Sequence, residues 1–144
     1  MTLWLLDTNV LSELRRPRPE QRVVAFIASQ PLEALYVSIV TFAELRFGIE
    51  RLPAGPQRAD LTDWLNQRVR PMFTGRVHPI NEDVTVRWRI LVNEGRRNGY
   101  TFSQPDLLIA ASALVSGLTL VTRNTTDFAA ARVPILNPWS DPLP

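Results

Sequence analysis

Three acidic residues that are far apart in the chain share one kind of local setting, an acid next to apolar sequence. Asp7 directly follows an apolar run at residues 3–6. Glu44 and Asp106 each lie in the first turn of a predicted helix and are followed by apolar residues. A carboxylate in apolar surroundings is costly unless it is paired, hydrogen-bonded or bound to a cation. If strand ends and helix starts converge at one edge of a sheet, these three carboxylates would meet in one pocket.

Three carboxylates in one pocket would have a specific chemical consequence. Like charges at close range cannot all stay ionised unless a cation joins them. Oxygen ligands without nitrogen or sulfur select a hard divalent ion, Mg²⁺ or Mn²⁺. Such an ion can activate water and stabilise charge that develops on a phosphate oxygen. The chemistry implied is hydrolysis of a phosphodiester or phosphoryl group.

Each of these acids also has a purely structural explanation, which is helix capping. Asp7 stands where a strand gives way to a helix, and aspartate is a preferred N-cap residue. The segments Thr41–Glu44 and Ser103–Asp106 match the capping box, in which the acid bonds back to the cap residue. The helix dipole also favours acids near helix N-termini. For each acid taken singly, both explanations stay open.

The composition excludes several other kinds of site. The chain has no cysteine and a single histidine, His78, which rules out disulfides, thiolate zinc sites, cysteine nucleophiles and histidine clusters. All 16 basic residues are arginine. The absence of lysine counts against haloacid-dehalogenase-type phosphatases, receiver domains and P-loop nucleotide binders, each of which places a lysine near a phosphate. Arginine suits bidentate contact with phosphate, so a nucleic acid is a plausible partner, although an arginine-rich genome would explain the same composition.

Predicted strands and helices alternate along the whole chain. This alternation predicts an α/β fold with a parallel sheet covered on both faces, as one domain over residues 1–144. The helix that Ser103 opens is apolar nearly all round and is therefore expected to be central and buried. The apolar stripe on two other helices is interpreted as core, with a dimer or partner face as the alternative. Its members are Leu61, Trp64, Leu65, Trp88 and Leu91, and the strands are expected near residues 3–6, 35–37, 77–80, 118–121 and 134–136.

The hydropathy of the chain indicates no membrane association. The longest uncharged stretch, residues 107–122, is shorter than the roughly 20 apolar residues that a bilayer span needs. The N-terminal apolar run is short and has no basic flank, unlike a signal peptide. A cytoplasmic protein is expected.

The acidic segments, taken together and in order, resemble the four motifs of PIN-domain ribonucleases, and most nearly those of VapC and FitB-like toxins of bacterial toxin–antitoxin pairs. The resemblance covers essentially the whole chain and implies a three-layer α/β/α fold with a mostly parallel central sheet. It also implies Mg²⁺- or Mn²⁺-dependent cleavage of RNA, a homodimer, and a VapB- or FitA-like antitoxin that covers the active site. The segments that carry it are Leu5–Asn9, Thr41–Leu45, Pro105–Ala111 and Thr122–Phe128, with Asn137–Trp139 similar to the FitB-type tail.

The resemblance also assigns roles to particular residues. Asp7, Glu44 and Asp106 match the three main metal-binding acids, so that one tightly held ion is expected. Asn124 stands where many relatives have an aspartate, and the fourth ligand is expected to be Asn124 or Asp127. Asp127 has helix capping as its structural alternative.

Four further residues are expected to position the substrate or the acids. Arg123 is the best single candidate for holding a neighbouring phosphate, and one carboxylate, such as Asp106 through water, would accept a proton. The alternative hypothesis is a PIN-like domain that has lost catalysis and binds nucleic acid or protein; Asn124 keeps this alternative open. The four positioning residues are Thr8, Asn9, Thr122 and Arg123.

Overall fold

Five short parallel strands form the centre of the computed structural model, which describes residues 1–101 and 103–144. The strand order is β3-β2-β1-β4-β5, so β1 lies in the middle of the sheet. Leu6 of β1 is aligned with Val37 of β2 and with Val121 of β4, which brings the carboxyl ends of these three strands side by side. The bounds are β1 Trp4–Leu6, β2 Leu35–Ser38, β3 Val77–His78, β4 Thr119–Val121 and β5 Ile135–Leu136.

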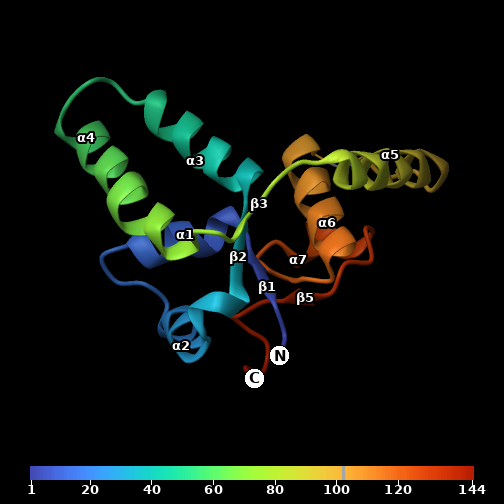
Figure 1. Cartoon of the computed structure of the whole chain (residues 1–144), viewed down its shortest axis with the longest axis horizontal. Coiled ribbons are helices and arrows are strands. Elements are labelled where there is room, and N and C mark those ends of the chain that lie inside the picture. The colour runs from blue at the N-terminus through green and yellow to red at the C-terminus, as the bar shows by residue number, and fades with distance from the viewer. Residues whose placement is uncertain (102) are drawn as a thin grey trace.

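Helices cover both faces of the sheet, and each face has its own hydrophobic core. Because successive side chains of a strand point to opposite faces, Trp4 and Leu6 pack into one core while Leu5 packs into the other. In Figure 1, α1 to α4 lie on one side of the strands and α5 to α7 on the other. The helices are α1 Thr8–Arg15, α2 Gln21–Ser29, α3 Ile39–Glu50, α4 Pro56–Asp63, α5 Glu82–Arg97, α6 Gln104–Ser116 and α7 Thr125–Ala129.

This three-layer arrangement confirms the α/β/α prediction, and each expected strand is present. The helix α6 begins after Ser103, ends at Gly117 in the left-handed conformation, and buries six residues of its central part, as expected. Leu65 and Leu91 of the predicted apolar stripe are buried, and its other members are partly buried, so the core interpretation is confirmed. His78 is buried against Pro79 and Ser116, which agrees with a structural role.

The predicted start of α3 is wrong. The helix begins at Ile39, and the Ser38 hydroxyl accepts a hydrogen bond from the Val40 N–H at 3.0 Å, so Ser38 is its N-cap. Thr41 is fully buried inside the helix and cannot serve as the cap. Glu44 therefore lies in the second turn, out of reach of a capping box, and helix capping no longer explains this acid.

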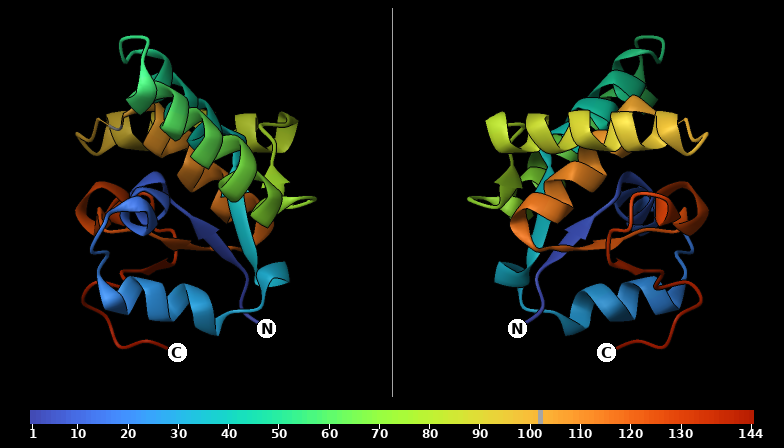
Figure 2. Two further views of the ribbon diagram at one scale, coloured as in Figure 1. Left: turned by 90° about the vertical axis from the view of Figure 1, so that its left-hand side faces the viewer. Right: turned by 90° about the vertical axis from the view of Figure 1, so that its right-hand side faces the viewer.

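The two views in Figure 2 show α3, α4 and α5 gathered at one end of the molecule, with α2 and both termini at the other. Among the described residues, none of the helices combines the length and the hydropathy that a bilayer span requires.

Candidate active site

The first and fourth sequence motifs meet where β1 and β4 end. The Asp7 N–H donates to the carbonyl oxygen of Val121 at 2.9 Å, so the residue that follows β1 lies directly against the residue that ends β4. Asp7 is only 4% exposed and Thr122 is fully buried. Residues 115 positions apart are thus held together by the register of the central strands.

The Asp7 carboxylate accepts hydrogen bonds at both of its oxygens. Oδ1 accepts from the Thr8 N–H at 2.8 Å, so Asp7 is the N-cap of α1, as the capping explanation predicts. Oδ2 accepts from the Thr122 hydroxyl at 2.8 Å and from the Asn9 amide at 3.3 Å. A simple cap needs only the first of these bonds. The other two fix the carboxylate in a single orientation.

Asn9 and Thr122 also bond to each other and to the segment after β4. The Thr122 Oγ1 accepts from Asn9 Nδ2 at 3.1 Å and from the Asn124 N–H at 3.0 Å, so its own hydrogen is left for Asp7. The Asn9 Oδ1 accepts from the Arg123 N–H at 3.2 Å. The structure therefore brings together three residues that the sequence analysis selected and gives Asn9 and Thr122 the task of orienting Asp7.

Thr8 follows Asp7 directly, but its side-chain hydroxyl does not take part in these hydrogen bonds. Its Oγ1 is buried and has no hydrogen-bond partner among the described residues, and the same is true of the Thr41 Oγ1, three residues before Glu44. A buried polar atom without a partner is rare and calls for an explanation such as water or an ion.

Burial and the charges of two other acids of the predicted site act on Asp7. The pKa of Asp7 is raised above its ordinary value, chiefly by burial and further by the charges of Asp106 and Asp127, while hydrogen bonds from Thr122 and Thr8 oppose this. Two ion pairs are seen in the described parts of the chain, Arg16 with Glu13 and Arg46 with Glu50, and neither includes these acids.

The pKa of Glu44 is raised as well. Although the residue as a whole is exposed, its carboxyl group is partly screened from solvent, which raises its pKa, and the charges of Asp7 and Asp106 raise it further. Asp106 lies in the first turn of α6, where its N–H donates to the Ser103 hydroxyl at 3.3 Å. Glu44 and Asp106 thus approach Asp7 from α3 and α6, helices on opposite faces of the sheet (Figure 1).

The acids of the predicted site are not gathered into a metal cage in the described residues. Within residues 1–101 and 103–144, no three His, Asp or Glu side chains stand close enough together to hold an ion as they are arranged. Asp106 and Asp127 line a cavity of about 600 Å³, and Glu44 lines a separate depression of about 250 Å³. The chemistry of these donors, which are all carboxylate oxygens, is that of ligands for a hard divalent ion.

The two candidates for a fourth ligand, Asn124 and Asp127, have different surroundings in the structure. Asn124 is the residue before α7, and its side chain makes no capping bond and is exposed. Asp127 lies in the first turn of α7, lines the same cavity as Asp106 and raises the pKa of Asp7 through its charge.

The side chain of Arg123 lies over the C-terminal tail. Its guanidinium carbon is 5.3 Å from the centre of the Trp139 ring. The Trp139 N–H donates to Asn137 Oδ1 at 2.9 Å, so the Asn137–Trp139 segment forms a local turn that presents the ring to Arg123. Sequence reasoning noted the tail motif but missed this contact, because no spacing rule connects the tail to the fourth motif.

Glu44→Gln is expected to stabilise the metal-free protein at neutral pH, by on the order of a degree or two in melting temperature. A raised acid pKa means that the folded protein holds a proton which the unfolded chain has released. Stability therefore falls as the pH rises through the interval between the ordinary and the raised pKa. Glutamine does not ionise, so Glu44→Gln avoids this loss of stability. The gain in melting temperature is therefore expected near pH 7 and should disappear near pH 4.

Thermal unfolding in the presence of a chelator at both pH values measures this effect. The matched control is Glu33→Gln, which removes an exposed acid outside the site. A gain that is equal at pH 4 and pH 7 would show that the ionised Glu44 carboxylate is not its source.

The parallel sheet and the acids at its carboxyl edge define an α/β/α domain with an acidic site. The family model for the PIN domain matches residues 4–134, and this chain belongs to the PIN-domain family. Among curated proteins, it is 42% identical to Toxin FitB of Neisseria gonorrhoeae, over 95% of this chain and 99% of that protein. It is 40% identical to VapC ribonuclease Y4jK of Sinorhizobium fredii, over 94% of this chain and 96% of that one.

Solved structures show the same relationship. The crystal structure of FitAcB from Neisseria gonorrhoeae contains a chain that is 41% identical and superimposes with a TM-score of 0.89, covering 95% of this chain and 99% of that one. The VapBC-1 structure from nontypeable Haemophilus influenzae is more distant, at 25% identity and a TM-score of 0.73, with 96% and 100% coverage. The fold inferred from the alternating elements is therefore that of the family.

Proposed function

We propose that this chain is the toxin of a bacterial toxin–antitoxin pair and that it cleaves RNA by metal-assisted hydrolysis of phosphodiester bonds. The observation that carries the proposal is the Asp7 carboxylate, which is buried, held at both oxygens, and subject to the charges of Asp106 and Asp127 without a paired arginine among the described residues. Such an arrangement suits a cation, and the helix cap accounts for only one of its hydrogen bonds. The names of the relatives, VapC ribonuclease and Toxin FitB, point in the same direction.

The ligands of the proposed ion are the carboxylates of Asp7, Glu44 and Asp106. PIN ribonucleases depend on divalent metals; for this chain we propose Mg²⁺, with Mn²⁺ as a substitute, because all the donors are oxygen. Asp127 is favoured over Asn124 as a further ligand, since its charge acts on Asp7 and it lines the cavity with Asp106. When bound, the ion supplies an activated water and neutralises charge on the scissile phosphate.

The residues around these ligands have distinct tasks in the proposed reaction. Thr122 and Asn9 orient the Asp7 carboxylate through their hydrogen bonds, and the bond from Thr122 favours its ionised form. Asp106 is half-buried at the cavity wall, where it can accept a proton from water. Arg123 is exposed beside the fourth motif and is proposed to hold a flanking phosphate, which would make RNA binding weaker at high salt.

The proposed partners follow from the family and from the solved relatives. The neighbouring structures are FitAB and VapBC complexes, in which the toxin is bound to its antitoxin. For this chain we propose a FitA- or VapB-like antitoxin that covers the acidic cavity, and a homodimer. The exposed Phe47 on α3 offers apolar surface for a protein partner. We further propose that residues 1–144 act as one domain in the cytoplasm, where RNA and antitoxin are present.

Chelation of divalent ions is expected to stop RNA cleavage by the purified chain, and addition of Mg²⁺ or Mn²⁺ is expected to restore it. Cleavage of a labelled single-stranded RNA, followed on denaturing gels, measures the effect, with Asp106→Asn purified in parallel as a control for contaminating nucleases. Cleavage that persists equally under chelation would contradict the proposal. RNA binding without cleavage in any ion would indicate the catalytically inactive binding module.

A further inference from the structure

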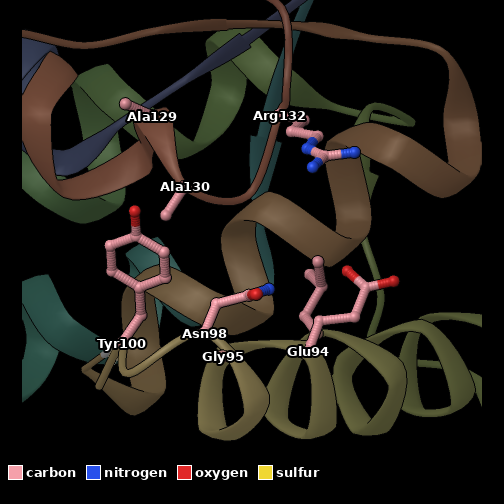
Figure 3. A pocket seen from close by; sticks show the side chains of 8 residues that line it. Glu94, Gly95, Asn98, Tyr100, Ala129, Ala130 and Arg132 are labelled. Carbon is pink, nitrogen blue, oxygen red and sulfur yellow. The ribbon is translucent and has the colours of Figure 1, made fainter.

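A second cavity of about 580 Å³ adjoins the acidic one. It lies between the C-terminal end of α5 and the segment that follows α7 (Figure 3). Tyr100, Ala129 and Ala130 line both this cavity and the one that contains Asp106 and Asp127. Tyr100 therefore lies where the two cavities adjoin.

The end of α5 fixes Tyr100 in place while leaving its ring accessible. Gly99 has a left-handed φ of +76°, and the Tyr100 N–H donates to the carbonyl oxygen of Gly95 at 2.7 Å. The Gly99 N–H also points back to the carbonyl oxygen of Arg96, at 3.5 Å, which completes a Schellman cap. The backbone of Tyr100 is thus anchored, yet the residue is 56% exposed. An anchored and exposed aromatic ring is a ready platform for stacking.

Arg132 stands on the opposite side of the cavity in an unusual backbone conformation. Its φ of +57° is the only positive φ at a non-glycine residue in the described parts of the chain. Glycine adopts this conformation without strain, whereas an arginine is disfavoured there. Figure 3 shows Tyr100 on one side of the cavity, Arg132 and Glu94 on the other, and Asn98 between them. Neither of the ion pairs described above includes Arg132, so its charge is available to a ligand.

We propose that this cavity is a nucleotide subsite, in which the base next to the scissile phosphate stacks on Tyr100 and the phosphate beyond it pairs with Arg132. Single-stranded RNA is bound in this way, by stacking on aromatic rings and by cationic contacts to its backbone. The Asn98 amide also lines the cavity and can hydrogen-bond to a base edge. The proposal rests on the proposed ribonuclease function and adds the place where the strand is held.

RNA affinity measured without metal tests this subsite independently of cleavage. The wild-type chain and its variants are titrated into a fluorescein-labelled single-stranded RNA in a chelating buffer, and anisotropy is recorded. Tyr100→Ala is expected to weaken binding by about 5- to 150-fold, the usual effect of removing one stacked base contact. Tyr100→Phe keeps the ring and is expected to bind like the wild type, so a loss in Tyr100→Phe would overturn the stacking role.

Arg132→Gly separates an effect on RNA from an effect on folding. Because glycine favours the left-handed backbone, the melting temperature is expected to stay within a few degrees of the wild type, while RNA affinity falls. The slope of log affinity against log salt is expected to decrease in magnitude by about 0.7, the value for one phosphate contact to a single strand. The matched control is Arg18→Gly, which removes the same charge from an exposed loop outside both cavities.

The outcomes distinguish this proposal from the one on which it rests. If the wild-type chain cleaves RNA with Mg²⁺ but Tyr100→Ala and Arg132→Gly bind RNA as tightly as it does, the subsite is wrong and the nuclease stands. Equal losses in Arg132→Gly and Arg18→Gly would also overturn it, since they would show only the effect of net charge. If the wild-type chain neither binds nor cleaves RNA, both proposals fail.

Discussion

Asp7→Asn is expected to reduce the rate of metal-dependent RNA cleavage by well over 100-fold. Loss of a group that merely orients a metal ligand typically costs about 10- to 100-fold, and a direct anionic ligand contributes more. The fold should survive, because asparagine is as good an N-cap as aspartate and can still accept the bond from the Thr8 N–H. Initial cleavage rates together with circular dichroism measure the two effects separately.

Glu33→Gln is the matched control for Asp7→Asn, since it neutralises an exposed acid in the turn before β2. It is expected to cleave RNA at the wild-type rate. If Asp7→Asn also retained a rate within about threefold of wild type while remaining folded, Asp7 would be only a helix cap. The metal site would then have to be built from other residues.

Thr122→Val is expected to lower cleavage activity by about 10- to 100-fold at neutral pH. It is also expected to reduce the free energy of unfolding by about 1–3 kcal/mol, because it leaves buried hydrogen-bonding groups without partners. The lost hydroxyl donates to Asp7 Oδ2 and accepts from the Asn9 amide and the Asn124 N–H. Valine keeps the shape of threonine, so packing alone does not account for either loss.

The pH profile of Thr122→Val shows whether the hydroxyl acts through Asp7. The hydrogen bond from Thr122 lowers the pKa of Asp7, so its removal raises that pKa further above the ordinary value. Because the ionised carboxylate is the form that binds metal, half-maximal activity is expected at a higher pH than in the wild type. Thr122→Ser retains the hydroxyl and should restore the wild-type profile. A rate loss without any shift of the profile would indicate a structural role only.

The overall fold could be predicted from sequence because its signals are local. An apolar run followed by polar residues marks each strand, and the alternation with helices requires a parallel sheet. The start of α3 could not be predicted in the same way. Ser38 and Thr41 are both suitable caps, and the β-branched pair Ile39–Val40 between them favours a strand as much as a helix. The strand β2 ends at Ser38, which pairs with His78 of β3. This pairing joins segments that are distant in the chain, so the local sequence does not reveal it.

The sequence was sufficient to propose the residues of the candidate site, but it did not give their arrangement in space. The acids and their neighbours follow from the four motifs, whereas the bond from Thr122 to Asp7 depends on the alignment of β1 with β4. Tyr100 and Arg132 escaped sequence reasoning because neither belongs to a motif. Their significance comes from a helix cap and from a backbone dihedral angle, which the sequence of this chain does not reveal.

The central place of β1 has a consequence for the choice of ion. Asp7 is tied to a strand that is bonded to a neighbour on each side, so this proposed ligand can move very little. Glu44 and Asp106 project from helices and are less buried, which leaves them free to adjust. One rigid donor and two adaptable ones can accommodate cations of slightly different radius. For the proposed metal site we therefore expect magnesium and manganese to be interchangeable.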